Sequence, residues 1–153
     1  MTTSTPIPAL SARDIGEAAR ASQALLDRLL DEAGLAFPEW TILFALDTTG
    51  PLARSELVRG QADGLMVAEA TARATVDGLV ASGLVGAAEA AGDGDDDPRL
   101  VPTSAGEAVF RPIRQEVSRI SGVIYGDLPP ADLEVTRRTL AEVTRRATAL
   151  LVR

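Results

Sequence analysis

Arginine side chains between Gly50 and Gly106 are the groups of this chain best suited to recognition chemistry. A guanidinium binds a phosphate through two parallel hydrogen bonds and reads guanine in the major groove of DNA. All fifteen basic residues are arginines, and this segment holds four of them: Arg54, Arg59, Arg73 and Arg99. It also holds nine acidic residues, which leaves it with −5 of the chain's net charge of −7. Because phosphate neutralisation supplies most non-specific affinity for DNA, this charge opposes DNA binding.

Several reactive residue types are missing from the sequence. The chain has no cysteine, no histidine and no lysine. Disulfides, zinc sites built from cysteine and histidine, cysteine nucleophiles and a Ser-His-Asp triad are therefore excluded. No pair of carboxylates has a spacing typical of acid–base catalysis. We therefore predict no catalytic residue and no cofactor.

A run of aspartates precedes Arg99 and offers oxygen ligands of the kind that divalent cations prefer. The run lacks the spacing of an EF-hand loop, and charge blocks of this type are usually solvated loops. The simpler interpretation is a solvated loop, so no metal site is predicted. The aspartates concerned are Asp93, Asp95, Asp96 and Asp97.

Most of the five aromatic residues fall in two helical segments, and two interpretations of them remain open. The simpler is core filling. The alternative places them beside a ligand pocket in which Arg111 or Arg114 holds an anion. The candidate ligand-binding residues are Trp40, Phe44, Phe110 and Arg114, with Phe37 as a further aromatic neighbour.

Length and composition are those of an ordinary globular domain. At 153 residues, with 46% hydrophobic and 24% charged residues, the chain is long enough to bury a substantial core. No apolar run approaches the roughly 20 residues that span a bilayer, and the first residues do not resemble a secretory signal. Arginine without lysine, together with abundant Ala, Gly, Asp and Val, suggests a GC-rich bacterial genome. We therefore expect a cytoplasmic bacterial protein that does not act at a membrane.

Helical periodicity predicts the first two helices. Apolar residues recur every three or four positions from Ser11 to Ala33, with Ser11 as a cap and Gly34 as the end. A second helix begins near Pro38 and ends before the turn at residues 48–51. Residues 1–10, which contain two prolines, are expected to form a flexible arm.

The next segment is typical of a helix-turn-helix followed by a β-hairpin. Ser55 is expected to cap a short helix that stops near Gly60. A longer helix from about Met66 to Ser82 follows, with Ala72, Val76, Leu79 and Val80 facing inward. Two short strands, at residues 84–85 and 100–101, enclose a small and polar stretch that resembles a long hairpin tip.

Two long helices complete the chain. Thr103 is expected to cap the first, in which Pro112 introduces either a kink or a late start. The second follows the turn at residues 128–130 and carries Glu134–Arg138 and Glu142–Arg146 pairs at i,i+4 spacing. Its apolar positions have the spacing of a coiled-coil seam, which suits a dimer interface better than internal packing. This seam consists of Leu133, Thr136, Leu140, Val143, Ala147 and Leu150.

The order of these elements and motifs resembles the MarR family of winged helix-turn-helix regulators. The resemblance extends from about Ser11 to the C-terminus. It depends on the order and spacing of short motifs, none of which is specific alone. They are FPEWTIL at 37–43, GPL at 50–52, ELV at 56–58, TARATVDGL at 71–79, GLV at 83–85, DDPR at 96–99 and TSAG at 103–106.

The resemblance implies a mainly α (α+β) fold, a winged helix-turn-helix with long N- and C-terminal dimerisation helices. The winged lobe would span residues 37–103, and residues 11–36 and 104–153 would form the dimerisation region of a homodimer. The helix that contains Arg73 would enter the major groove of double-stranded DNA, and the wing would reach the minor groove. A small aromatic or anionic ligand would bind between the two regions. The implied DNA-binding residues are Arg54, Thr71, Arg73, Thr75 and Arg99.

The sequence departs from the family pattern where DNA contacts are expected. Ala87 and Ala88 occupy positions that are usually basic, and the wing has one arginine after four aspartates. Arg73 has a second interpretation as a solvated partner of Glu69 or Asp77, and Arg99 as a partner of the aspartates. Three functions therefore remain open. The first is a ligand-responsive DNA-binding regulator; the main alternative is a fold of the same type, without DNA binding, that serves as a small-molecule-binding protein or an enzyme. The third is an acidic partner protein that mimics DNA, for which the aspartate-rich wing is the only support.

Overall fold

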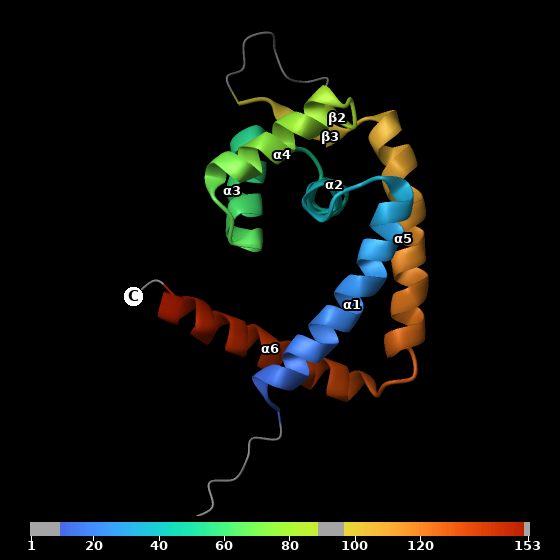
Figure 1. Ribbon diagram of the computed structural model, residues 1–153, viewed down its shortest axis with the longest axis vertical. Coiled ribbons are helices and arrows are strands. Elements are labelled where there is room, and N and C mark those ends of the chain that lie inside the picture. The colour runs from blue at the N-terminus through green and yellow to red at the C-terminus, as the bar shows by residue number, and fades with distance from the viewer. Residues whose placement is uncertain (1–9, 89–96, 152–153) are drawn as a thin grey trace, which may run out of the picture. The chain divides into compact units, whose positions relative to one another are not determined.

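The computed structural model describes residues 10–88 and 97–151, so all but the last residue of the expected arm at residues 1–10, and the tip of the hairpin, lie outside the described residues. The chain divides into two compact units, residues 1–115 and 116–153. The first unit contains α1 to α4, all three strands and the first half of α5 (Figure 1). Mainly helical architecture with one small sheet confirms the predicted fold class.

The first helix, α1 (Ala12–Ala33), begins and ends as the sequence predicts. The Asp14 carboxylate accepts the Ser11 backbone N–H at 2.8 Å, and the Ser11 hydroxyl accepts the Asp14 N–H at 3.3 Å. These two bonds form a capping box, which satisfies backbone donors that the first turn leaves unpaired. Gly34 ends the helix with a φ of 66°, a left-handed conformation that glycine adopts without steric cost.

The second helix, α2 (Phe37–Thr49), supplies the centre of the core. Pro38 lies in its first turn, where a missing N–H costs no helical hydrogen bond. The Glu39 carboxylate accepts the Ala36 N–H at 2.7 Å and so caps the helix. Ile42 and Leu43 are 1% and 0% exposed, so this helix is enclosed on its inner side.

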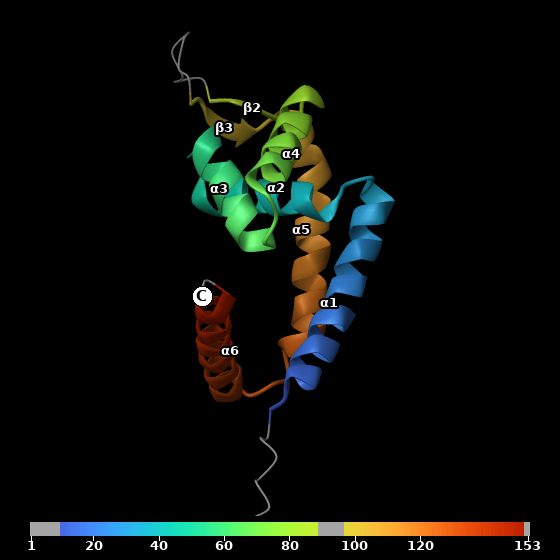
Figure 2. The same ribbon diagram turned by 60° about the vertical axis from the view of Figure 1, so that its left-hand side comes forward.

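The helix-turn-helix consists of α3 (Arg54–Leu65) and α4 (Glu69–Ala81), which pack against each other (Figure 2). Three expected boundaries were wrong. Ala53, not Ser55, is the N-cap of α3, because Arg54 N–H already donates to Pro98 O at 3.1 Å. The helix also continues through Gly60, since burial of Leu57 and Val58 outweighs the roughly 1 kcal/mol that a helical glycine costs.

The third wrong boundary concerns Met66, which ends α3 instead of starting the next helix. Its φ of 54° makes it the one non-glycine residue with positive φ in the described part of the chain. This left-handed conformation costs about 1–2 kcal/mol for an ordinary residue, and packing of α3 on α4 supplies the compensation. The turn between the two helices is therefore determined by tertiary contacts and not by local preference.

The sheet has three antiparallel strands in the order β1-β3-β2. β2 (Val85–Ala87) and β3 (Arg99–Pro102) pair in the register Val85↔Pro102, which confirms the expected hairpin. β1 (Leu52–Ala53) was not predicted, because two residues are too short to show alternation. It pairs with β3 in the register Leu52↔Leu100 and thereby joins the start of α3 to the wing.

Gly106 makes the close contact between α5 (Ser104–Tyr125) and the chain that enters β2. A Cβ at this position would collide with the carbonyl oxygen of Leu84. The helix begins as predicted, because the Thr103 hydroxyl accepts the Gly106 N–H at 3.1 Å. The late start considered for Pro112 is wrong, since α5 runs from Ser104 through this proline.

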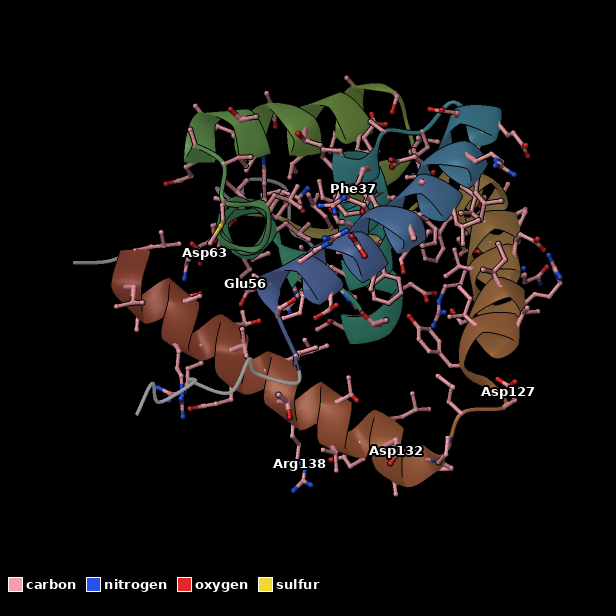
Figure 3. The ribbon with its side chains drawn as sticks, turned by 60° about the horizontal axis from the view of Figure 1, so that its bottom comes forward. Phe37, Glu56, Asp63, Asp127, Asp132 and Arg138 are labelled. Carbon is pink, nitrogen blue, oxygen red and sulfur yellow. The ribbon has the colours of Figure 1, made fainter. Side chains whose placement is uncertain are left out.

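The second unit contains the end of α5 and the whole of α6 (Pro130–Leu151). None of its described residues is buried, in contrast to the first unit. Both expected ion pairs are present: Glu134–Arg138 at 3.8 Å and Glu142–Arg146 at 2.6 Å. Arg138 points away from its helix (Figure 3). Among the described residues, no helix combines the length and apolarity needed to cross a membrane.

Candidate functional site

The recognition helix of a helix-turn-helix needs one side in the core and the other free to contact a partner. In α4 the inner side is formed by Ala72, Val76 and Leu79, which are all buried. The expectation that Val80 also faces inward was wrong, since its side chain is 42% exposed. The opposite side, which we call the outer face of α4, carries Thr71, Arg73, Ala74 and Asp77, which are all exposed. The helix is therefore buried on one side and exposed on the other, as a helix that reads DNA must be.

Two of the three arginines expected to bind DNA, Arg54 and Arg73, have carboxylate partners within the chain. Arg73 Nη2 lies 3.0 Å from Glu69 Oε1, so the Glu69 alternative for its partner is the one observed. Asp77, the other partner considered for Arg73, instead pairs with Arg54 of α3. The ion pair between Arg54 and Asp77 joins residues 23 positions apart, so no local spacing could have revealed it.

The two threonines of α4 differ in their availability. Thr71 is exposed, whereas Thr75 is half-buried. The Thr75 hydroxyl donates to the backbone oxygen of Thr71 at 3.1 Å, which leaves its oxygen as the group free to accept. Thr71 is therefore the better placed of the two for an external contact.

The base of the wing is tied to the start of α3 by side chains and backbone. Asp97 accepts the Ser55 backbone N–H at 2.8 Å and the Ser55 hydroxyl at 2.6 Å. These hydrogen bonds from Ser55 hold the pKa of the Asp97 carboxyl below its ordinary value. Asp97 is thus a carboxylate cap on α3, a role that sequence analysis did not assign to it. The other aspartates considered as cation ligands, Asp93, Asp95 and Asp96, lie outside the described residues.

Arg99 also takes part in this connection. Its Nη2 donates to the backbone oxygen of Pro51 at 2.9 Å, while its side chain stays on the exposed side of β3. Of the aspartates considered as partners of Arg99, Asp95 and Asp96 lie outside the described residues, and Asp97 binds Ser55. The arginine is therefore held beside the start of α3, in the region where a wing meets the helix-turn-helix.

A cavity of about 280 Å³ lies between α3, α4 and the base of the wing. It brings together two of the five predicted DNA-binding residues, Arg54 and Arg73, whereas Thr71, Thr75 and Arg99 do not line it. Carboxylates belong to the same lining, so the two arginines face an environment of mixed charge. The lining residues are Arg54, Ser55, Val58, Glu69, Arg73 and Asp97.

Three of the four predicted aromatic residues, Trp40, Phe44 and Phe110, form one cluster in the first unit. Trp40 stacks on Phe110 with ring centroids 4.7 Å apart and lies 6.0 Å from Phe44. Trp40 and Phe110 are each 5% exposed, so both fill the core, as the simpler interpretation predicts. Phe44 is 38% exposed, and the Arg114 guanidinium lies over its ring at 5.1 Å.

A second cavity, of about 270 Å³, opens beside this cluster between α2 and α5. Of the four predicted ligand-binding residues, only Phe110 and Arg114 line it. Arg114 Nε is buried without a hydrogen bond in the described structure, and the nearby Asp47 carboxylate oxygen is 3.7 Å away. Arg111, the alternative anion holder, pairs with Glu107 at 2.9 Å. The full lining is Leu46, Asp47, Pro102, Glu107, Phe110, Arg111 and Arg114.

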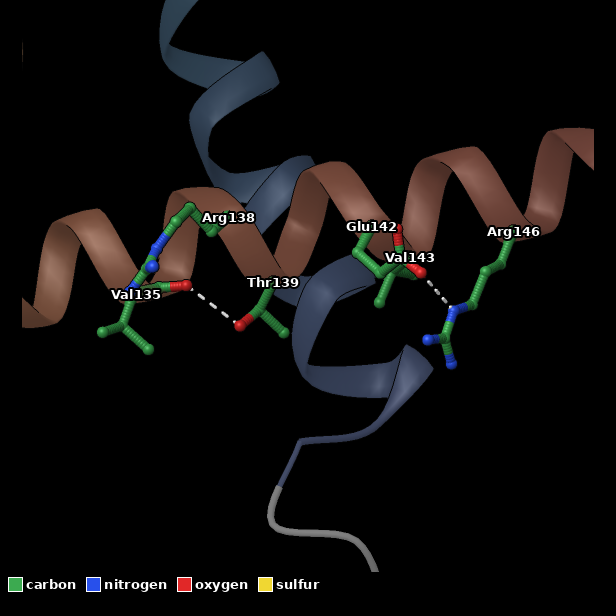
Figure 4. A pocket seen from close by; sticks show the side chains of 6 residues that line it. All are labelled: Val135, Arg138, Thr139, Glu142, Val143 and Arg146. Carbon is green, nitrogen blue, oxygen red and sulfur yellow. Dashed lines mark hydrogen bonds and ion pairs between the residues drawn. The ribbon is translucent and has the colours of Figure 1, made fainter.

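A hollow on α6 is a weaker candidate. A hollow of about 440 Å³ on α6 is lined by six residues of that helix alone (Figure 4). It lies beside the predicted seam, with Val143 common to both. In the described residues, no group of three acidic side chains is arranged to hold a metal ion.

Comparisons with known proteins bear on the fold. No family model matches the sequence, and no curated protein matches it. Solved structures do match. NadR in complex with 4-hydroxyphenylacetate is 20% identical, with a TM-score of 0.69 over 92% of this chain and 97% of that one. MarR of Staphylococcus aureus, in complex with salicylate and kanamycin, is 14% identical, with a TM-score of 0.69 over 90% and 89% of the two chains.

A third match is a putative MarR family transcriptional regulator from Listeria monocytogenes, solved with a 26mer DNA. It is 21% identical, with a TM-score of 0.70 over 90% of this chain and 88% of that one. The matches cover nearly all of both chains, so they include the helices on either side of the winged lobe. The chain therefore has the winged-helix fold of the MarR-type transcriptional regulators.

Proposed function

We propose that this chain is a MarR-type transcriptional regulator that binds double-stranded DNA as a homodimer. The observation that carries the proposal is that α4 is buried on one side only, with Arg73 and Thr71 on its exposed outer face. The attachment of the wing to the start of α3, through Asp97 and Arg99, supports it. A similar fold in the Listeria monocytogenes regulator was solved with DNA.

The homodimer part of the proposal rests on the second unit. Its described residues include eight exposed large apolar side chains and none that is buried. A helix normally buries its apolar stripe against another element, and a second copy of the chain offers one. These exposed residues are Val123, Ile124, Tyr125, Leu128, Val135, Val143, Leu150 and Leu151. Residues 11–36 and 104–153 are the dimerisation region of this proposal, and such a regulator would work in the bacterial cytoplasm.

A small aromatic or anionic ligand is the effector that we propose for the cavity between α2 and α5. Arg114 supplies positive charge there and has a buried Nε with no hydrogen-bond partner among the described residues. Phe110 supplies an aromatic wall; Trp40 stacks on Phe110, and Phe44 in turn contacts Trp40. NadR was solved with 4-hydroxyphenylacetate, and the Staphylococcus aureus protein with salicylate as well as kanamycin; the first two of these molecules are aromatic carboxylates.

One observation favours the alternative, a protein of this fold that binds a small molecule without reading DNA. Arg54, Arg73 and Arg99 each have an internal acceptor, so none presents an unoccupied guanidinium. DNA binding therefore needs a direct test.

The test is fluorescence anisotropy of the purified protein with labelled DNA from its own upstream region, titrated with salt. We expect Arg73→Ala to weaken binding to the specific site about 5- to 150-fold, since a bidentate base contact contributes ~1–3 kcal/mol. Arg138→Ala, which removes one exposed charge from α6, is the matched control and should leave binding unchanged. Binding no stronger than to random DNA, even at low salt, would reject the regulator and favour the alternative.

A further inference from the structure

Exposed charged residues of α4 form a row of alternating sign along the helix. Glu69, Arg73 and Asp77 follow one another at i,i+4 spacing, so their side chains lie along one side of the helix. The acidic members both bind arginines of the same surface: Glu69 binds Arg73, and Asp77 binds Arg54 of α3. Two acids of this lobe are therefore placed on arginines that face the proposed partner.

The Arg54–Asp77 pair is the more enclosed of the two. The side chain of Arg54 is 30% exposed and that of Asp77 is 51% exposed, against 52% and 67% for Arg73 and Glu69. A more enclosed pair is screened less by salt and by water. Because Arg54 begins α3 and also lines the cavity with Ser55 and Asp97, a phosphate that approaches this cavity must compete with carboxylates.

From this arrangement, and resting on the proposed function above, we propose that Asp77 is a specificity-determining residue. By holding Arg54 in an internal ion pair, it suppresses binding to DNA of arbitrary sequence. A phosphate that binds the Arg54 guanidinium must displace the Asp77 carboxylate, and the displaced carboxylate then repels the phosphate. DNA of arbitrary sequence is bound through phosphate contacts, so this exchange weakens its main source of affinity, whereas a specific site retains its base contacts.

The expected consequence is a gain of binding when the carboxylate is neutralised. Asp77→Asn preserves the size of the side chain but releases Arg54. We expect its affinity for a random-sequence duplex at low salt to rise at least tenfold. We also expect the slope of log K against log salt concentration to steepen by about 1, which corresponds to one additional neutralised phosphate.

Asp63→Asn is the matched control, because it makes the same change in net charge on the same lobe. Asp63 is an exposed residue of α3 (Figure 3), nine positions from Arg54, and makes no side-chain hydrogen bond or ion pair within the described structure. We expect it to raise affinity less than threefold. The double variant Arg54→Ala/Asp77→Asn should return to the wild-type affinity, since the gain acts through Arg54.

The experiment is fluorescence anisotropy of each full-length variant with a random-sequence duplex and with the upstream duplex. Equal gains in Asp77→Asn and Asp63→Asn, or a gain that survives Arg54→Ala, would overturn the role of Asp77 and leave the regulator function standing. If neither wild type nor Asp77→Asn binds any DNA at low salt, both proposals are rejected. If Asp77→Asn does not fold, the same DNA titration is made for the neighbouring Glu69–Arg73 pair. The variants are then Glu69→Gln alone and Glu69→Gln combined with Arg73→Ala.

Discussion

The two units of this chain bury their side chains very differently. Every buried apolar residue in the described structure lies at or before Ile113, within the first unit. The second unit has instead a regular set of ion pairs on α6 and a row of exposed apolar residues. The difference shows that the first unit carries its own core, whereas the described residues of α6 leave their apolar stripe exposed, which is the surface that the proposed dimer would bury.

The largest effect is expected from a cavity in the core of the first unit. Leu43 is 0% exposed, so Leu43→Ala should lower the free energy of unfolding by about 2–5 kcal/mol. Val80→Ala, at a position of α4 that is 42% exposed, is the control and should cost less than about 1 kcal/mol. Chemical denaturation followed by the fluorescence of Trp40, the only tryptophan, measures both. If both variants lower the free energy of unfolding by similar amounts, the first unit does not have a core of its own.

A smaller effect is expected from a charge in the seam of α6. Leu140→Asp should raise the dissociation constant of the proposed dimer at least 30-fold, about 2 kcal/mol, because an interface core does not tolerate an unpaired carboxylate. Ala131→Asp adds the same charge on the opposite side of the helix and should leave assembly unchanged. Analytical ultracentrifugation over a range of protein concentrations measures the dissociation constant of the dimer for each variant. A wild-type protein that remains a monomer throughout would remove the dimer from the proposed function.

The smallest effect concerns the acid stability of α6. Hydrogen bonds from Arg145, and then from Arg146, lower the pKa of Glu142 from 4.5 to about 2. Because the pKa is lower in the folded state, this stabilisation is complete above pH 4.5 and is lost as the pH falls towards 2. Thermal melts followed by circular dichroism should therefore show a smaller difference between pH 7 and pH 3 for Glu142→Gln than for wild type. If the change in melting temperature between pH 7 and pH 3 is the same for both proteins, these exposed ion pairs contribute nothing measurable to stability.

Local sequence signals predicted much of the fold. The capping box of Ser11, the helix start at Pro38 and the cap at Thr103 each depend on neighbours within three or four residues, and each was confirmed. The hairpin was also confirmed, because its strands are bounded by turn residues. The errors fall where tertiary contacts decide. Met66 adopts a left-handed conformation, and α3 begins before Ser55, since β1 pairs with β3.

The candidate site was predicted less completely than the fold. The pairing of Arg73 with Glu69 was one of two alternatives, because i,i+4 neighbours always lie within reach on a helix. Phe110 and Arg114 do line a cavity, but Asp47 beside Arg114 was missed. No spacing along the chain relates residues 47 and 114, and only the packing of α2 against its neighbours brings them together.

The sequence by itself determined the chemical inventory and the periodic faces of the helices. It fixed an arginine-only set of cations, a net acidic winged lobe and an apolar seam on the last helix. Tertiary structure alone decided which carboxylate meets which cation. Arg54 and Asp77 are 23 residues apart, and Ser55 and Asp97 are 42 apart. Such pairs form only after α3 packs on α4 and β1 pairs with β3, because local periodicity carries no information on contacts between distant segments.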